Sequence, residues 1–172
     1  MAPRAQCDLI ALDAPLVGPP GTKLTGIAAN ERSAYVAVAN GNELVLLGEV
    51  SGALQVVAVD YVSQGVIRAL AVVDDDLALL ADQQGRSTLE LRSLTDGTLG
   101  LVGSLTDLPN GARALEAQGS MLAVAAGARL ILIDASDPSY PQQVGSWSSG
   151  GPAVLSVAMA GPWLLAGSSD RV

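Results

Sequence analysis

The chain has 172 residues and a net charge of −8, from 17 acidic and 9 basic side chains. Lys23 is the only lysine and no basic stripe is present, so the composition does not favour a nucleic-acid partner. Histidine is absent, which excludes a Ser-His-Asp triad, and a single cysteine without histidine excludes the usual zinc ligand sets.

The N-terminal residues carry no visible targeting signal. Residues 1–8, MAPRAQCD, contain no apolar stretch, so no signal peptide is visible in this chain. Cys7 has no second cysteine with which to form an intrachain disulfide. No apolar run in the chain reaches the roughly 18 residues of a membrane-spanning helix, and we expect no membrane span.

Short apolar runs, bounded by residues that favour tight turns, follow one another in a recurring order. A first run stands alone at residues 9–12, and three units of four runs follow. These runs are 24–29, 34–38, 44–47 and 54–59, then 67–73, 77–81, 89–92 and 99–105, then 112–117, 121–125, 130–133 and 143–147. Two further runs, 154–159 and 163–166, begin a fourth unit.

The period of these units predicts the fold. The third run begins at Leu44, Leu89 and Leu130, at intervals of 45 and 41 residues. Four short antiparallel strands in roughly 40 to 45 residues are typical of a β-propeller blade. We therefore predict an all-β chain of propeller blades, and a plain β-sandwich with regular strand spacing is the alternative.

The predicted domain organisation is a single domain or propeller fragment over residues 1–172. Its whole blades cover about 24–66, 67–111 and 112–152, and half-blades are expected at 7–23 and 153–172. The two half-blades are complementary, because one resembles a third strand and the other offers the first two. The ring is expected to close within one chain as four blades, between two chains as eight, or in a longer protein from which this chain is excised. The second and third possibilities are preferred.

One unit resembles a known family. Residues 130–146, LILIDASDPSYPQQVGS, are similar to the signature of the LVIVD-repeat β-propellers, which are found mainly in bacterial and archaeal surface or secreted proteins. The resemblance implies an extracytoplasmic or cell-surface location. The other units keep the spacing, but Gly48 and Ser93 stand where this unit has Asp134, and only Asp13 agrees with it.

Two acidic segments are candidates for a metal site. Asp74, Asp75 and Asp76 offer oxygen ligands for calcium, or they form a solvated turn between two strands. The turn is preferred because the ordered ligand loop of a calcium hand is absent. Asp134 and Asp137 have the same two interpretations, and neighbouring Ser and Pro residues favour a turn. No metal site and no cofactor are predicted.

Two arginines form the one candidate ligand site. Arg68 and Arg113 recur at 45 residues, each opening a strand expected to line the central channel. Two arginines near one channel mouth predict a site for a small anion or carboxylate. The alternative is that each arginine pairs with a carboxylate of a neighbouring blade, such as Glu116.

The sequence as a whole predicts a non-enzymatic scaffold for protein–protein interaction or self-assembly. The expected partner is another protein or a second copy of the chain, as a homodimer, and no catalytic residue is predicted. The alternatives are a metal-dependent propeller enzyme of the lactonase or lyase type, and a binder of small anionic ligands at the channel mouth.

Overall fold

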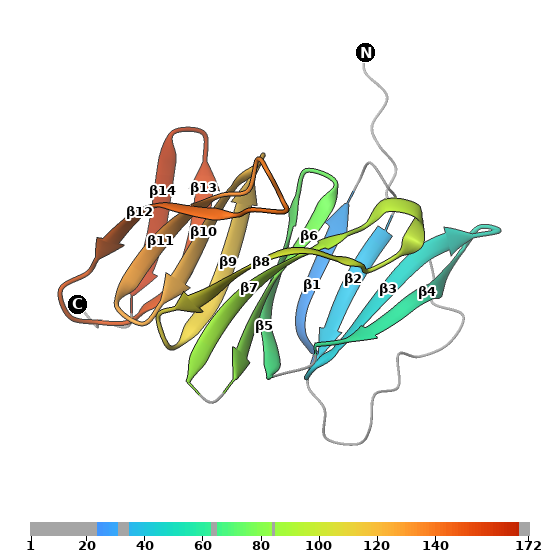
Figure 1. Cartoon of the computed structure of the whole chain (residues 1–172), viewed down its shortest axis with the longest axis horizontal. Helices are drawn as coiled ribbons and strands as arrows, with labels where there is room; N and C mark the ends of the chain where they lie inside the picture. The colour runs from blue at the N-terminus through green and yellow to red at the C-terminus, as the bar shows by residue number, and fades with distance from the viewer. Residues whose placement is uncertain (1–23, 31–34, 63–64, 84, 169–172) are drawn as a thin grey trace, which may run out of the picture.

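The computed structural model describes residues 24–30, 35–62, 65–83 and 85–168, and this part of the chain is all-β (Figure 1). Its one helical segment is the short 3₁₀ turn Thr95–Gly97. The half-blade expected at 7–23 lies outside the described residues. The strands are β1 (Leu24–Asn30), β2 (Tyr35–Asn40), β3 (Glu43–Val50), β4 (Ala53–Tyr61), β5 (Val66–Val73), β6 (Asp76–Gln83), β7 (Arg86–Ser93), β8 (Leu101–Leu108), β9 (Ala112–Gln118), β10 (Met121–Ala126), β11 (Arg129–Asp134), β12 (Gln142–Ser148), β13 (Val154–Ala160) and β14 (Trp163–Ser168).

The strands form four antiparallel sheets in chain order. The first sheet is β1 to β4, the second β5 to β8 and the third β9 to β12, and each strand pairs with the next one along the chain. Strands β13 and β14 form a two-stranded hairpin. The prediction of an all-β chain built from four-stranded antiparallel units is confirmed, and the arrangement is consistent with a β-propeller-like repeat.

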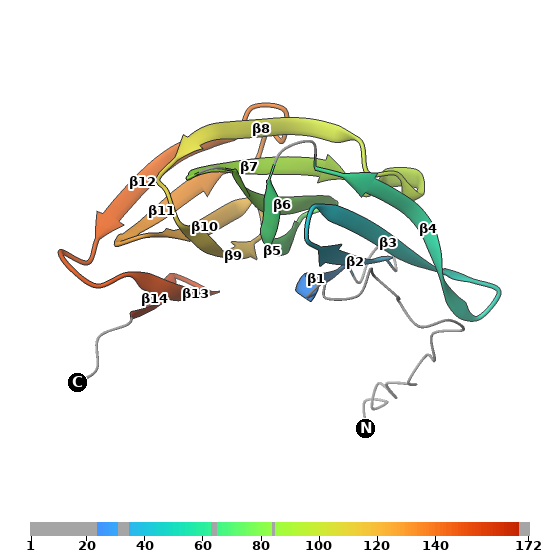
Figure 2. The same ribbon diagram turned by 90° about the horizontal axis from the view of Figure 1, so that it is seen from below.

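Successive sheets lie face to face. Strand β1 packs against β5, β5 against β9, and β9 against β13. Figure 2 shows the sheets following one another along an arc, with β1 at one end and the β13–β14 hairpin at the other. The described residues therefore form an open arc and not a closed ring.

The second strand of an inner sheet is buried on both faces. Every residue from Leu77 to Leu80 in β6 has 0% of its surface exposed, and the same holds from Leu122 to Ala125 in β10. Leu77 and Leu79 contact the core shared with the first sheet, whereas Ala78 and Leu80 contact the core shared with the third. This double burial explains why the sequence shows continuous apolar runs here and no alternation.

A β-bulge recurs near the start of the first strand of every sheet. One residue is left without a partner in the second strand at this point. These residues are Thr25 in β1, Arg68 in β5, Arg113 in β9 and Leu155 in β13. From each bulge, five more residues complete the first strand, so the bulge aligns the four sheets position by position.

A buried arginine links the first and second sheets. Arg92 in β7 takes the position that Leu47 and Ile133 occupy in the other sheets, and only 8% of its surface is exposed. It donates hydrogen bonds to Glu90 Oε2, at 2.7 Å from Nη2 and 3.1 Å from Nε, and to the carbonyl oxygen of Leu99 at 3.1 Å. It also pairs with the carboxylate of Asp60 in β4. The guanidinium thus satisfies acceptors on both sheets.

We expect Arg92→Met to lower the free energy of unfolding by about 3 kcal/mol, because it leaves the carboxylate of Glu90 without its cation in a half-buried site. Denaturant unfolding at one protein concentration measures the change. Arg86→Met is the matched control, since Arg86 and Asp107 are both exposed and 3.9 Å apart, and its cost should stay below about 1 kcal/mol. Equal losses in the two variants would contradict a stabilising role for the buried cluster.

Candidate functional site

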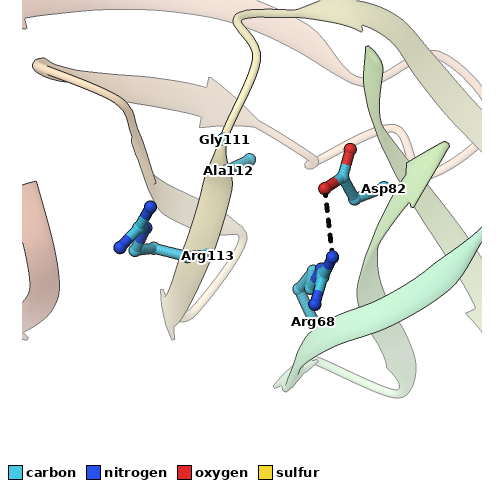
Figure 3. A pocket seen from close by; sticks show the side chains of 5 residues that line it. All are labelled: Arg68, Asp82, Gly111, Ala112 and Arg113. Carbon is cyan, nitrogen blue, oxygen red and sulfur yellow. Dashed lines mark hydrogen bonds and ion pairs between the residues drawn. The ribbon is translucent and has the colours of Figure 1, made fainter. Parts of the chain in front are cut away.

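A shallow cleft lies between the second and third sheets, at the end where β5 and β9 begin (Figure 3). Its volume is about 380 Å³, which suits a small ligand. The five lining residues are Arg68, Asp82, Gly111, Ala112 and Arg113. The two arginines that the sequence predicts as a ligand site therefore line one cleft.

The bulges position both arginines. Arg68 and Arg113 are the unpartnered residues at equivalent points of β5 and β9, and these strands pack side by side. A bulge turns a side chain away from the regular alternation of a strand, which places these two at the edge of the sheets and not in the core. Both side chains are exposed.

Arg68 has a carboxylate partner in its own sheet. Its Nη2 atom lies 3.4 Å from Oδ2 of Asp82, which belongs to the neighbouring strand β6. The alternative expected from sequence, pairing with Glu116 of the next sheet, is wrong for Arg68. The second oxygen of Asp82, Oδ1, is buried and has no hydrogen-bond partner among the described residues.

Arg113 differs from Arg68 in its surroundings. Figure 3 shows its guanidinium pointing away from Arg68 and Asp82. Within the described part of the chain it makes no ion pair or side-chain hydrogen bond. The cleft therefore contains one paired arginine and one arginine whose five donors face solvent, and the five lining residues include no hydroxyl, thiol or amine nucleophile.

The acidic segment at 74–76 is divided between a turn and a strand. Asp74 and Asp75 connect β5 to β6, and Asp74 has a φ of 50°. The residues equivalent to Asp74 in the third sheet and in the β13–β14 hairpin are Gly119 and Gly161. The predicted turn is confirmed for these two residues, but Asp76 belongs to β6. Burial raises the pKa of Asp76 above its usual 3.8, and the charges of Asp75 and Asp74 raise it further.

The Asp134 and Asp137 segment is a self-bonded turn. Oδ1 of Asp134 accepts a hydrogen bond from the backbone N–H of Ser136 at 2.9 Å, and Oδ1 of Asp137 accepts one from Ser139 at 3.0 Å. The hydrogen bond from Ser136 lowers the pKa of Asp134. The turn interpretation is confirmed here. Across the described residues, no three His, Cys, Asp or Glu side chains are grouped to hold a metal ion.

The first sheet has an apolar face that no other described sheet covers. Ile27 in β1 is 70% exposed, whereas the equivalent residues Leu70 in β5 and Leu115 in β9 are each 8% exposed. Leu70 and Leu115 pack into cores shared with the preceding sheet. Ile27 therefore occupies the equivalent of a core position, but no described sheet covers it.

The β13–β14 hairpin has the complementary uncovered face. Leu165 in β14 is 59% exposed, whereas the equivalent Ala78 and Ala123 are each 0% exposed. Ala78 packs into the core shared with the following sheet. Trp163, at the start of β14, is 71% exposed. Sequence patterns do not distinguish these residues from core residues, because only the position of a sheet along the arc decides whether its face is covered.

Comparison with known proteins finds solved structures of similar fold and assigns no activity. No family model matches the chain, no curated protein matches it, and the resemblance to LVIVD repeats stays a prediction. Among solved structures it is similar to the computationally designed Ika4 protein, with a TM-score of 0.73 and 15% identity over 96% of this chain and 94% of that one. It is also similar to the computationally designed Ika8 protein, with a TM-score of 0.67 and 14% identity over 84% of this chain and 42% of that one.

These likenesses define the chain as a member of a fold class of repeated antiparallel sheets, and identities this low show the fold alone. The chain spans nearly the whole of Ika4 but less than half of Ika8. No helix in the described residues is long and apolar enough to cross a membrane.

We expect Asp76→Asn to raise the stability of the protein at neutral pH. Because the folded-state pKa lies above the usual 3.8, the folded protein binds this proton more tightly than the unfolded chain does. The free energy of unfolding of the wild-type protein should therefore rise as pH falls towards 3.8, because Asp76 becomes protonated. Asp76→Asn should not show this rise. Denaturant unfolding between pH 4 and pH 7, with the exposed Glu49→Gln as a charge-matched control, measures the difference. A fall in stability at neutral pH would contradict the expectation.

Proposed function

We propose that this chain is a non-enzymatic β-propeller scaffold that assembles with a second copy of itself into a closed ring, at the cell surface. The observation that carries the proposal is the pair of uncovered apolar faces at the two ends of the arc. Ile27 marks one face and Leu165 the other, and both stand at positions that are buried in the inner sheets.

The two faces are complementary in kind. Ile27 lies on the side that a preceding sheet covers in the second and third sheets, and Leu165 lies on the side that a following sheet covers. The β13–β14 hairpin of one copy can therefore pack against the first sheet of another as the inner sheets pack together. Two copies related by a two-fold axis make this junction twice and leave neither face uncovered.

The lengths of the two solved neighbours fit either one copy or two copies of this chain, since Ika4 is about as long as this chain. The match to Ika8 covers 84% of this chain and 42% of that chain, so that chain is about twice as long as this one. Two copies of this chain supply the length of Ika8, and one copy supplies the length of Ika4. The support for assembly comes from the fold and from the two exposed apolar faces, and not from residues shared with the solved neighbours.

The scaffold interpretation agrees with the chemistry of the cleft. Asp82 is the only lining side chain able to act as a base, and Arg68 already pairs with it. The metal-dependent enzyme expected as an alternative gains no support from the described residues. We therefore propose binding and assembly without bond chemistry.

We expect light scattering on a sizing column to give twice the 17.3 kDa mass of one chain. Ile27→Asp should convert the protein to a folded monomer, because a charge replaces an apolar side chain in the junction without disturbing the core of its own sheet. Leu101→Asp is the matched control, since Leu101 is similarly exposed but lies on β8, away from both ends of the arc.

A wild-type mass of one chain would contradict the two-copy ring and favour closure within a single chain. Loss of the dimer in Leu101→Asp to the same extent as in Ile27→Asp would show that the effect arises from charge alone and would contradict the proposed junction.

A second candidate function is the binding of a small anion at the cleft. The observation that favours it is that Arg68 and Arg113, at equivalent bulges, both line one cleft. Asp82 offsets the charge of Arg68, so Arg113 supplies the available donors. The expected ligand is therefore a small anionic group such as a carboxylate or a phosphate monoester, held by charge-assisted hydrogen bonds.

We expect inorganic phosphate, titrated by calorimetry, to bind the wild-type protein and to bind Arg113→Glu at least about tenfold more weakly, because a charge-assisted hydrogen bond contributes about 1.5 to 3 kcal/mol. Arg68→Glu should have a comparable effect, since it places two carboxylates in the cleft. Arg86→Glu, an exposed arginine that does not line the cleft, is the control. Equal binding in all three variants would eliminate the site.

A further inference from the structure

The chain contains the dipeptide Asn-Gly at two places, Asn40–Gly41 and Asn110–Gly111. In such a pair the backbone nitrogen of the glycine attacks the side-chain amide of the asparagine, because the glycine has no Cβ to hinder the approach. The N–Cγ bond forms, the Cγ–Nδ2 bond breaks, and ammonia leaves with the proton that the glycine N–H gives up. Water then opens the cyclic imide to aspartate or isoaspartate, so a neutral amide becomes a carboxylate.

Asn110–Gly111 lies in the turn between β8 and β9, outside any strand. Asn110 is exposed, and Gly111 has a φ of 78°. The carbonyl oxygen of Gly111 accepts a hydrogen bond from the backbone N–H of Gly127 at 3.3 Å, whereas the N–H of Gly111 donates none within the described residues. The attacking nitrogen is therefore not held by a hydrogen bond to this part of the chain, and the exposed turn allows the imide to close.

Asn40–Gly41 is held by paired strands instead. Asn40 is the last residue of β2, and it pairs with Leu24 on one side and Glu43 on the other. Its Oδ1 atom is buried, and the carbonyl oxygen of Gly41 accepts a hydrogen bond from the backbone N–H of Ile67 at 2.8 Å. Closure of an imide here would rotate the backbone out of the strand conformation and break these pairs. We therefore expect the fold to protect Asn40.

We infer that Asn110 is a site of spontaneous deamidation in the folded protein, and that the carboxylate formed there weakens anion binding at the cleft. Gly111, the residue bonded to Asn110, lines the cleft together with Arg113 (Figure 3). The Nδ2 atom of Asn110 lies 3.7 Å from the point where a Cβ on Gly85 would sit. A negative charge beside the cleft lowers the positive potential that its arginines supply. The effect on binding rests on the second candidate function proposed above.

Peptide mapping by mass spectrometry tests the modification on the folded protein incubated at neutral pH. Asn110 should gain a carboxylate at least about tenfold faster than Asn40, because reaction at Asn40 requires local opening of paired strands. In the chain unfolded by guanidinium chloride the two sites should react at comparable rates, so the ratio between them measures the effect of the fold. Asn110→Gln is the control variant and should keep its amide, since the longer side chain closes a larger ring less readily.

Two results of the mapping would overturn the assigned site. One is an intact amide at Asn110 in the folded protein after the unfolded chain has reacted at both positions. The other is a rate at Asn40 in the folded protein that equals or exceeds the rate at Asn110.

Calorimetric titration with inorganic phosphate tests the effect on the cleft. Asn110→Asp should bind phosphate about twofold more weakly than the wild-type protein, because a solvent-screened unit charge near the site adds a modest repulsion. Asn110→Gln should bind phosphate as the wild-type protein does. Gln55→Glu is the matched control, since it adds the same charge at an exposed position of β4 in the first sheet, and its affinity should also be unchanged.

The two measurements separate the parts of the inference. A wild-type protein that binds no phosphate would overturn the second candidate function and the effect on binding, while peptide mapping still decides the modification. Equal phosphate affinity in Asn110→Asp and the wild-type protein would overturn the effect on binding alone. An equal loss of affinity in Gln55→Glu would assign that loss to net charge, and it would overturn the same part.

Discussion

The whole structure depends on the burial of both faces of each sheet. The second strand of an inner sheet, such as β6, is apolar at every position from Leu77 to Ala81, so no single neighbour is able to cover it. A sheet of this kind is stable only between two others, because burial of apolar surface is the main favourable term in folding. Stacking of sheets is therefore the condition under which each one folds, and the ends of the stack are the points where this condition is not met.

Charged side chains are distributed in accordance with that constraint. Arg68 and Arg113 sit at bulges, where the strand turns its side chain out of the packed layers. Arg92 is the exception, since it replaces an apolar residue between the first and second sheets and needs Glu90, Asp60 and the carbonyl of Leu99 as acceptors. Such a cluster is expected to favour one pairing of sheets over others, because a different neighbour would leave the guanidinium without these acceptors.

Much of the fold follows from local sequence. The strands and their four-strand grouping are predictable, because each apolar run is bounded by turn residues and repeats at nearly constant spacing. The 45-residue recurrence also predicts that Arg68 and Arg113 lie together. The partnership of Arg68 with Asp82 is not predictable in this way, since it depends on how far the β6–β7 hairpin extends beyond the bulge. The burial of Arg92 depends on contacts between sheets, which no local pattern reports.

An uncovered apolar face and an open strand edge coincide at β14, and this coincidence favours assembly by pairing of sheets over loose apolar contact. Among the described residues, Leu165 lies on an uncovered face of β14 and this strand pairs only with β13, so a single proposed junction would cover the face and the edge together. The net charge of −8 opposes this association, since two like-charged chains repel one another. Salt screens that repulsion, while burial of Ile27 and Leu165 is largely unaffected by it. The proposed junction would therefore depend on apolar packing of the kind that holds the inner sheets of the chain together.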